Sequence, residues 1–303
     1  MLRYIILGLI LAGLFQVFFW ITQDNRVTLK QDASERIESL SYSPFKGYDK
    51  KVLSPEQIEE DIGILLNFTD KVRTYSTADA KVILEVASKT KMKVDLGLWL
   101  SGDHTENHLE IERAVKLLEK YPNNINNVIV GNETLLRTDL NEVELIAYID
   151  YMRQFTKKPI TTAEVWHTLD KYGEIGNHVD FITVHILPYW EKVPIEQFNS
   201  FVIEKYSIIE KKYPNKKITI GETGWPSHGY NFNSAVPSLK NQAVAIRGFL
   251  NLAKEKNWSY NIIEAFDQPW KGYDEGNVGQ YWGIFTSDRE LKFYLSGDIE
   301  LNQ

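Results

Sequence analysis

The chain has 303 residues, 43% of them hydrophobic and 13% aromatic, which is enough for one large α/β domain with a full core. Its formal net charge of −7, without any cluster of Lys or Arg, argues against a nucleic-acid partner. The lack of cysteine excludes disulfides and thiolate zinc sites but does not fix the compartment.

Residues 4–21 form an apolar run in which Gln16 is the only strongly polar residue. At ~1.5 Å per residue a helix of this length spans about 27 Å, close to the ~30 Å hydrocarbon core of a bilayer. We therefore predict a single transmembrane helix within residues 1–22 and a polar tether over 23–36. Arg3 precedes the run, so the N-terminus is expected in the cytoplasm and the remaining chain on the extracytoplasmic side, in the cell envelope or periplasm. A cleaved signal peptide is the alternative, although residues 20–23 make a poor cleavage site.

From residue 37 onward, predicted strands and helices alternate. Helix starts are expected at a capping box from Ser54 to Gln57 with Pro55 in the first turn, at Thr77, near His108, at Asp139 with Glu142, and near Leu239. Strands are predicted over residues 37–42, 71–75, 94–100, 126–133, 160–166, 181–186, 218–222 and 260–266.

Eight strands, each followed by a helical segment, have the count and size of a (β/α)₈ TIM barrel. We assign this barrel to residues 37–303. A doubly wound dinucleotide fold is less favoured, because no Gly-rich loop follows the first strand.

Two of the predicted strands end at a glutamate. Residues 218–222 end at Glu222, directly before Gly224 and Pro226, and residues 126–133 end at Glu133. A single Glu in such a place is more often a solvated strand end. Two carboxylates delivered to the same edge of a barrel, however, are the arrangement that glycoside hydrolysis requires.

Other catalytic chemistries lack their sequence patterns. The six His are scattered, without a His-x-His or His-Glu-x-x-His motif, and no Ser lies in a Gly-x-Ser-x-Gly elbow. We therefore expect neither a metal nor an organic cofactor. Of the remaining polar strand-end residues, His185 is expected to be structural, and Glu164 either a substrate subsite or scaffolding.

Aromatic residues near the strand ends are expected to line a sugar-binding cleft, because flat rings match the apolar faces of sugars. From their positions we predict that four of them bind substrate: Tyr42, Tyr189, Trp225 and Trp270.

The segments Val130-Gly131-Asn132-Glu133 and Gly221-Glu222-Thr223-Gly224-Trp225-Pro226-Ser227 resemble the acid/base and nucleophile signatures of glycoside hydrolase family 17. The resemblance extends in matching order over about residues 37–292. It includes the segments 41–45, 72–75, 185–190, 264–271 and 281–285. It implies a retaining (β/α)₈ enzyme acting on β-1,3-glucan, in a family that also includes transglucosylases.

Carried over residue by residue, the resemblance makes Glu133 the general acid/base and Glu222 the nucleophile. It further implies substrate-binding or supporting roles for Asn132, Arg73, Tyr75, Lys271 and Glu275. One position departs from the family pattern, because Gln268 stands where a Glu is common, and this puts the local charge balance in doubt. For a retaining mechanism we expect the two carboxyls about 5–5.5 Å apart. Mutual repulsion should then keep Glu133 protonated at rest with a raised pKa.

The sequence thus predicts a membrane-anchored β-1,3-glucan hydrolase that works by double displacement. Three alternatives remain: a β-1,3-glucan transglucosylase, a barrel enzyme acting on other β-glucosides, and a barrel that binds glucan without cleaving it. The first shares the covalent intermediate of the hydrolase. The last would be expected to lack one of the two glutamates.

Overall fold

A computed structural model describes residues 13, 27–29, 36–297 and 299–301. Its centre is a closed barrel of parallel strands in the order β10-β11-β2-β5-β6-β7-β8-β9. In chain order these strands are β2 (Leu40–Ser41), β5 (Lys71–Arg73), β6 (Lys93–Leu98), β7 (Ile125–Asn132), β8 (Ile160–Val165), β9 (Ile182–His185), β10 (Ile218–Thr223) and β11 (Ser259–Ile262). Each lies within or beside a predicted strand, and the predicted barrel is confirmed.

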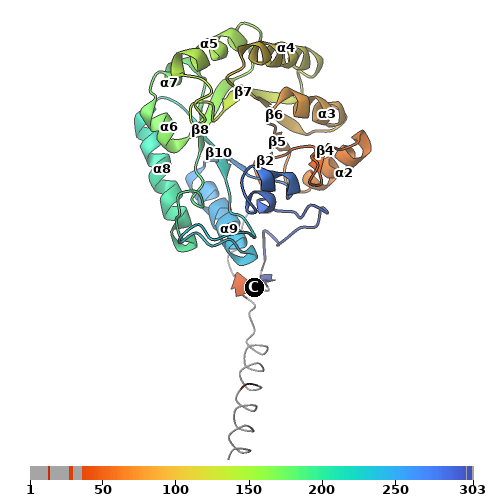
Figure 1. Cartoon of the computed structure of the whole chain (residues 1–303), viewed down its shortest axis with the longest axis vertical. Helices are drawn as coiled ribbons and strands as arrows, with labels where there is room; N and C mark the ends of the chain where they lie inside the picture. Colours follow the sequence, from red (N-terminus) through yellow and green to blue (C-terminus); the bar gives the residue numbers. More distant parts are fainter. Residues whose placement is uncertain (1–12, 14–26, 30–35, 298, 302–303) are drawn as a thin grey trace, which may run out of the picture.

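The α-helices form a ring around the barrel (Figure 1). They are α2 (Pro55–Leu65), α3 (Thr77–Ala87), α4 (His104–Lys120), α5 (Glu142–Arg153), the short α6 (Trp166–Lys171) and α7 (Ile175–His178), α8 (Phe198–Lys212) and α9 (Leu239–Lys256). The longer helices each bury apolar residues. In α2, for example, Ile58, Ile62 and Leu65 are buried at helical spacing.

The helix starts test the predicted caps. The capping box of Ser54 and Gln57, with Pro55 in the first turn, is confirmed. The Thr77 prediction is off by one, because Ser76 caps α3 and Thr77 is its first helical residue. The predicted start of α5 at Asp139 is wrong, because Asn141 and Glu144 form its capping box. Asp139 instead pairs with Arg137 at 2.7 Å.

The predicted helical segment after the eighth strand is not found. In the described part of the chain the only helices after β11 are the short 3-10 helices η2 (Pro269–Tyr273) and η3 (Gly279–Tyr281). Proline and glycine interrupt this segment and favour turns. A further addition is the hairpin of β3 (Phe45–Lys46) and β4 (Lys51–Val52), which comes between β2 and α2.

Part of the predicted tether is a strand. β1 (Val27–Leu29) pairs antiparallel with β12 (Ile299–Leu301), and this small sheet lies outside the ring of helices (Figure 1). The predicted transmembrane run, apart from Gly13, lies outside the described residues. Among the helices that the structure describes, none has the length and apolar character to cross a membrane.

Candidate active site

The two predicted catalytic glutamates lie at one mouth of the barrel, where the strands end. β7 ends at Asn132, and Glu133 follows it with a φ of 54°. Glu222 lies near the end of β10 and is the register partner of His185, the last residue of β9. The register of β10 shifts here against both neighbours, and such irregularities re-aim side chains beside active sites.

The two carboxylates approach each other closely. One oxygen of Glu133, one oxygen of Glu222 and a ring nitrogen of His185 all lie within 4.8 Å of one another. This separation is close to the about 5–5.5 Å between the carboxyls of retaining glycosidases and well below the about 6.5–9.5 Å of inverting ones. The pair therefore has the geometry for attack by one carboxylate and proton transfer by the other.

Glu222 is held by two donors that converge on its Oε1 atom. The Tyr75 hydroxyl donates a hydrogen bond of 2.8 Å, and Arg73 Nη1 lies 3.3 Å away. Burial, reinforced by the charge of Glu222, raises the pKa of Tyr75 well above its ordinary value. Its hydroxyl therefore remains protonated and keeps donating. The other oxygen of Glu222 is left for a substrate.

Arg73 is buried and links several strand ends. Its Nη1 donates to the Gly221 carbonyl at 2.6 Å, and its Nη2 donates to Asn132 Oδ1 at 2.6 Å. A Cβ atom at Gly221 would lie 2.4 Å from Thr183 Cγ2 and 3.1 Å from Arg73 Nη1. Glycine at this position leaves the space that the guanidinium fills.

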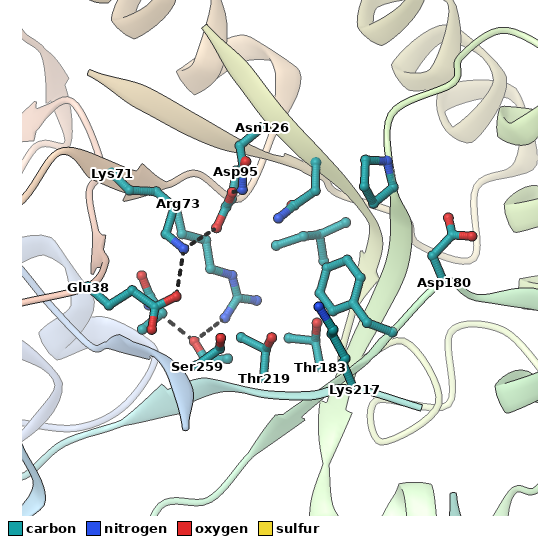
Figure 2. A pocket seen from close by; sticks show the side chains of 16 residues that line it. Glu38, Lys71, Arg73, Asp95, Asn126, Asp180, Thr183, Lys217, Thr219 and Ser259 are labelled. Atoms are coloured by element: carbon teal, nitrogen blue, oxygen red, sulfur yellow. Dashed lines mark hydrogen bonds and ion pairs between the residues drawn. The ribbon is translucent and has the colours of Figure 1, made fainter. Parts of the chain in front are cut away.

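Beneath Arg73 the barrel interior is polar. Figure 2 shows Lys71, Asp95 and Glu38 around this end of the barrel, with Arg73 pointing into the cavity, which measures about 350 Å³. Lys71 Nζ lies 3.0 Å from Glu38 Oε1 and 4.0 Å from Asp95 Oδ2. These residues come from the N-terminal parts of the strands, where polar side chains usually serve stability. They line the same cavity as Arg73.

His185 bridges the two glutamates. Its side chain is fully buried, with Nδ1 at 2.7 Å from Glu133 Oε1 and Nε2 at 3.5 Å from Glu222 Oε1. The expected raised pKa of Glu133 is wrong in this structure. Burial acts to raise it, but the hydrogen bond with His185 and the charges of Arg73 and Arg137 lower the pKa of Glu133 overall.

A cleft runs across the barrel mouth on both sides of the glutamate pair. One part, of about 460 Å³, is lined by Trp166, Trp190 and Trp282, and the other, of about 550 Å³, by Phe45, Trp99 and Trp270. Four residues line both parts: Glu133, Glu222, Ile263 and Glu275. The glutamate pair therefore lies where the two parts meet.

Of the remaining predicted site residues, several line the second part of the cleft: Asn132, Tyr75, Trp270, Lys271 and Glu275. Lys271 Nζ bonds both oxygens of Glu264, at 3.0 and 2.9 Å, and burial raises the pKa of Glu264 to about 7. Gln268, the departure from the family pattern, accepts a 2.7 Å hydrogen bond from the Trp270 indole. The Gln268 amide thus fixes the position of the Trp270 ring in the cleft.

Three predicted substrate-binding aromatics do not reach the cleft. Tyr42, Tyr189 and Trp225 are at most 1% exposed. Their polar atoms bond within the protein, to Asp61 Oδ2, Tyr230 O and Val236 O respectively. The prediction that they bind substrate is wrong in this structure, because each ring packs behind the strand ends. Arg73, also buried, contacts Glu222 and does not line the cleft.

Two further strand-end residues are now placed. His185 was expected to be structural but touches both glutamates. Glu164 is scaffolding, because it accepts hydrogen bonds from the backbone of Leu135 and Leu136. The cleft tryptophans Trp99 and Trp166 fall near the ends of the predicted strands 94–100 and 160–166, but their distance from the glutamates cannot be predicted from sequence.

The residues that could offer ligands to a metal are the same three groups. Among the described residues, Glu133, His185 and Glu222 bring their donor atoms together. Both nitrogens of His185 already have partners, and the Arg73 cation lies 3.3 Å from Glu222 Oε1. A second cation would be repelled there, so the set fits proton transfer and not metal binding.

A close pair of carboxylates at the mouth of a TIM barrel is the site of a glycosidase, and comparison with known sequences agrees. Residues 39–283 match the BtgE/BtgC glycoside hydrolase domain, and the chain belongs to this family. The resemblance to glycoside hydrolase family 17 is thereby confirmed.

Individual relatives cover most of the chain. A glucan 1,3-beta-glucosidase of Saccharomyces cerevisiae is 25% identical over 286 residues, spanning 84% of this chain and 89% of the yeast protein. A glucan 1,3-beta-glucosidase of Arthroderma benhamiae is 28% identical over 270 residues, or 81% and 85% of the two chains. An active-site mutant of the Rhizomucor miehei beta-1,3-glucanosyltransferase, solved with laminaritriose, is 25% identical with a TM-score of 0.77 over 84% of this chain and 95% of that one.

Proposed function

We propose that the chain is a retaining β-1,3-glucan-active glycosidase in which Glu222 is the nucleophile and Glu133 the general acid/base. The observation that carries the mechanism is the pair of carboxylate oxygens within 4.8 Å at the junction of the two cleft parts. The substrate class is supported by the names of the relatives, which act on 1,3-linked glucans.

In the first step Glu222 attacks the anomeric carbon while Glu133 gives its proton to the departing glycosidic oxygen. Tyr75 and Arg73 hold Glu222 Oε1, so its Oε2 is the oxygen available for attack. Because the pKa of Glu133 is lowered, its acid form is lost as pH rises through that pKa. We therefore expect kcat/KM to fall on the alkaline side.

In the second step an incoming hydroxyl gives its proton to Glu133 and attacks the glycosyl-enzyme, which frees Glu222. If the hydroxyl is water the outcome is hydrolysis, and if it belongs to a sugar the outcome is a longer glucan. The cleft continues on both sides of the pair with tryptophans in each part, so a sugar acceptor has a surface to bind. This feature, with the glucanosyltransferase among the structural relatives, favours transglucosylation as the second candidate.

The test is to incubate the purified full chain with one pure β-1,3-gluco-oligosaccharide and to follow product lengths by mass spectrometry. Glu222→Gln is the blank, because the amide cannot form the covalent intermediate but keeps the shape. Products that are only shorter identify a glucanase, and their size pattern separates endo from exo action. Products longer than the substrate identify a transglucosylase. No turnover above the blank would contradict the proposal.

The roles of the two glutamates are separated by azide rescue of alanine variants. With Glu133→Ala, azide should attack the glycosyl-enzyme and give a β-glycosyl azide. With Glu222→Ala, azide should replace the nucleophile and give the α-anomer. The opposite assignment of anomers would reverse the proposed roles.

We also propose that residues 4–21 anchor the enzyme in a membrane, with the barrel on the extracytoplasmic side. The support is the length and apolar character of this run and the position of Arg3. Carbonate extraction of a membrane fraction tests the anchor, and protease protection of the barrel in sealed inside-out vesicles tests its side. Release by carbonate, or digestion in those vesicles, would overturn the respective part.

A further inference from the structure

His185 lies at the centre of the site, and its ring nitrogens face different partners. Nδ1 is 2.7 Å from Glu133 Oε1, and Nε2 is 3.1 Å from Arg73 Nη1. The ring comes from the end of β9 and is fully buried, so its position is set by packing.

The partners decide where the imidazole carries its proton. A guanidinium has only donors and does not lose its proton in proteins. Since Arg73 Nη1 faces Nε2 at hydrogen-bond distance, Nε2 must accept, and the proton of the neutral ring is on Nδ1. A second proton on Nε2 would be directed against Arg73, while Glu222 Oε1, at 3.5 Å, is beyond good hydrogen-bond distance. Nδ1–H therefore donates to Glu133 Oε1.

This bond makes the two oxygens of Glu133 unequal. Oε1 accepts from His185 whether Glu133 is ionised or protonated, because a carboxyl oxygen without the proton is still an acceptor. The exchangeable proton must then be on Oε2. We propose that His185 is a positioning residue that reserves Glu133 Oε1 as an acceptor and thereby assigns the catalytic proton to Oε2, an inference that rests on the proposed glycosidase function.

The proton balance involves only Glu133 and the substrate. In the first step the proton passes from Glu133 Oε2 to the glycosidic oxygen as the bond from that oxygen to the anomeric carbon breaks and the bond to Glu222 forms. In the second step the incoming hydroxyl returns a proton to Oε2 as the bond to Glu222 breaks. His185 keeps its Nδ1 proton throughout and stabilises the Glu133 carboxylate that exists between the two steps.

Other charged groups act on this dyad from every neighbouring strand end. They are Arg73 from β5, Arg137 after β7, Glu164 from β8, Glu222 from β10, and Glu275 after η2. A variant at His185 leaves all of these groups in place. The variant also removes the Nε2 acceptor of Arg73. The effect of the Nδ1 hydrogen bond is therefore the difference between a variant that keeps a donor at the Nδ1 position and one that lacks it.

The chain offers a matched pair of substitutions. His185→Asn retains a donor near the Nδ1 position, whereas His185→Leu has nearly the same shape as Asn without any donor. His185→Gln carries its amide nearer the Nε2 position. For kinetics we compare a β-1,3-gluco-oligosaccharide, whose leaving sugar needs the proton, with dinitrophenyl β-laminaribioside, whose leaving group does not.

We expect His185→Leu to lower kcat/KM on the oligosaccharide by about 10- to 100-fold, within the range of general acid catalysis, and on the dinitrophenyl substrate by less than about 3-fold. The alkaline limb of its kcat/KM profile should move to higher pH, because Glu133 loses a donor that stabilises its ionised form. His185→Asn should stay near the wild type in both respects, and His185→Gln should follow His185→Leu.

Equal losses on the two substrates with an unmoved alkaline limb in His185→Leu would overturn the inference, because that is the result of a packing role. If His185→Leu does not fold, a wild-type profile in His185→Gln would overturn it equally. An inactive wild type on both substrates is a different result, since it removes the proposed function and the inference with it.

Discussion

At the scale of single residues, Trp270 and Trp225, which follow neighbouring strands, have different roles. Trp270 lines the cleft, and its indole is held by Gln268. Trp225 is fully buried, packs against Tyr189 and Phe198, and donates its indole N–H to Val236. A ring in a cleft contributes to binding, whereas a buried ring contributes to stability.

This difference predicts opposite effects of the same substitution. Trp270→Ala should reduce kcat/KM on a β-1,3-gluco-oligosaccharide by about 10-fold, mainly through KM, with little change in the free energy of unfolding. Trp225→Ala should lower the free energy of unfolding by about 3–5 kcal/mol, because it leaves a cavity. Urea denaturation and steady-state kinetics on both variants provide the measurement. If Trp225→Ala were as stable as the wild type but no longer bound glucan, Trp225 would have to be a substrate-binding residue.

At the scale of elements, hydrogen bonds join the ends of neighbouring strands. The segment after β7 carries Glu133 in a left-handed conformation, and Glu164 of β8 holds this segment by accepting from the N–H groups of Leu135 and Leu136 at 2.8 and 3.3 Å. These hydrogen bonds are buried, so the conformation of the segment that carries Glu133 depends on the charge of Glu164.

The resulting pH dependence has a definite sign. Burial raises the pKa of Glu164 from 4.5 to about 7, although the backbone donors oppose it. Between these values the folded protein holds a proton that the unfolded chain releases, so the contribution of Glu164 to the free energy of unfolding is lost as pH rises from about 4.5 to about 7. Glu164→Gln should flatten this decline by on the order of 2–3 kcal/mol. Urea unfolding of both proteins between about pH 5 and pH 8 measures it, and parallel curves would refute the assignment.

At the scale of the whole molecule, the barrel closes although no α-helix follows the eighth strand in the described part of the chain. The segment after η3 reaches α2. There Arg289 Nε and Nη2 each donate a hydrogen bond of 2.8 Å to Asp61, one to each carboxylate oxygen. Asp61 also accepts from the Tyr42 hydroxyl at 2.9 Å, and it is nearly fully buried. This network joins the segment after the eighth strand to α2 and to Tyr42, directly after β2.

Loss of Arg289 should therefore destabilise the fold without touching the chemistry. We expect Arg289→Met to lower the free energy of unfolding by about 3–5 kcal/mol, because Asp61 is left as a buried charge without its partner. The control is Arg153→Met, which breaks the half-exposed pair with Asp180 and should cost no more than about 1 kcal/mol. Activity per folded molecule should be unchanged in both. Equal stability of the two variants would show that the network does not close the barrel.

Much of this architecture can be predicted from local sequence. Strand runs, the capping box at Ser54 and Gln57, and the glutamates at the ends of two runs all follow from the residue pattern over a few positions. The positions of Tyr42, Tyr189 and Trp225 were misjudged because proximity to a strand end in sequence does not say whether a ring points over the barrel mouth or behind it.

The sequence by itself determined the barrel, its order of strands and the two glutamates, because hydrophobic periodicity and turn residues act over short distances along the chain. Only the tertiary structure decided the protonation of the site. His185 and Arg73 come from strands more than one hundred positions apart, and the pKa of Glu133 depends on which of its neighbours is a donor at 2.7 Å. Electrostatic and hydrogen-bond energies depend on distance in space, which closure of the barrel alone sets.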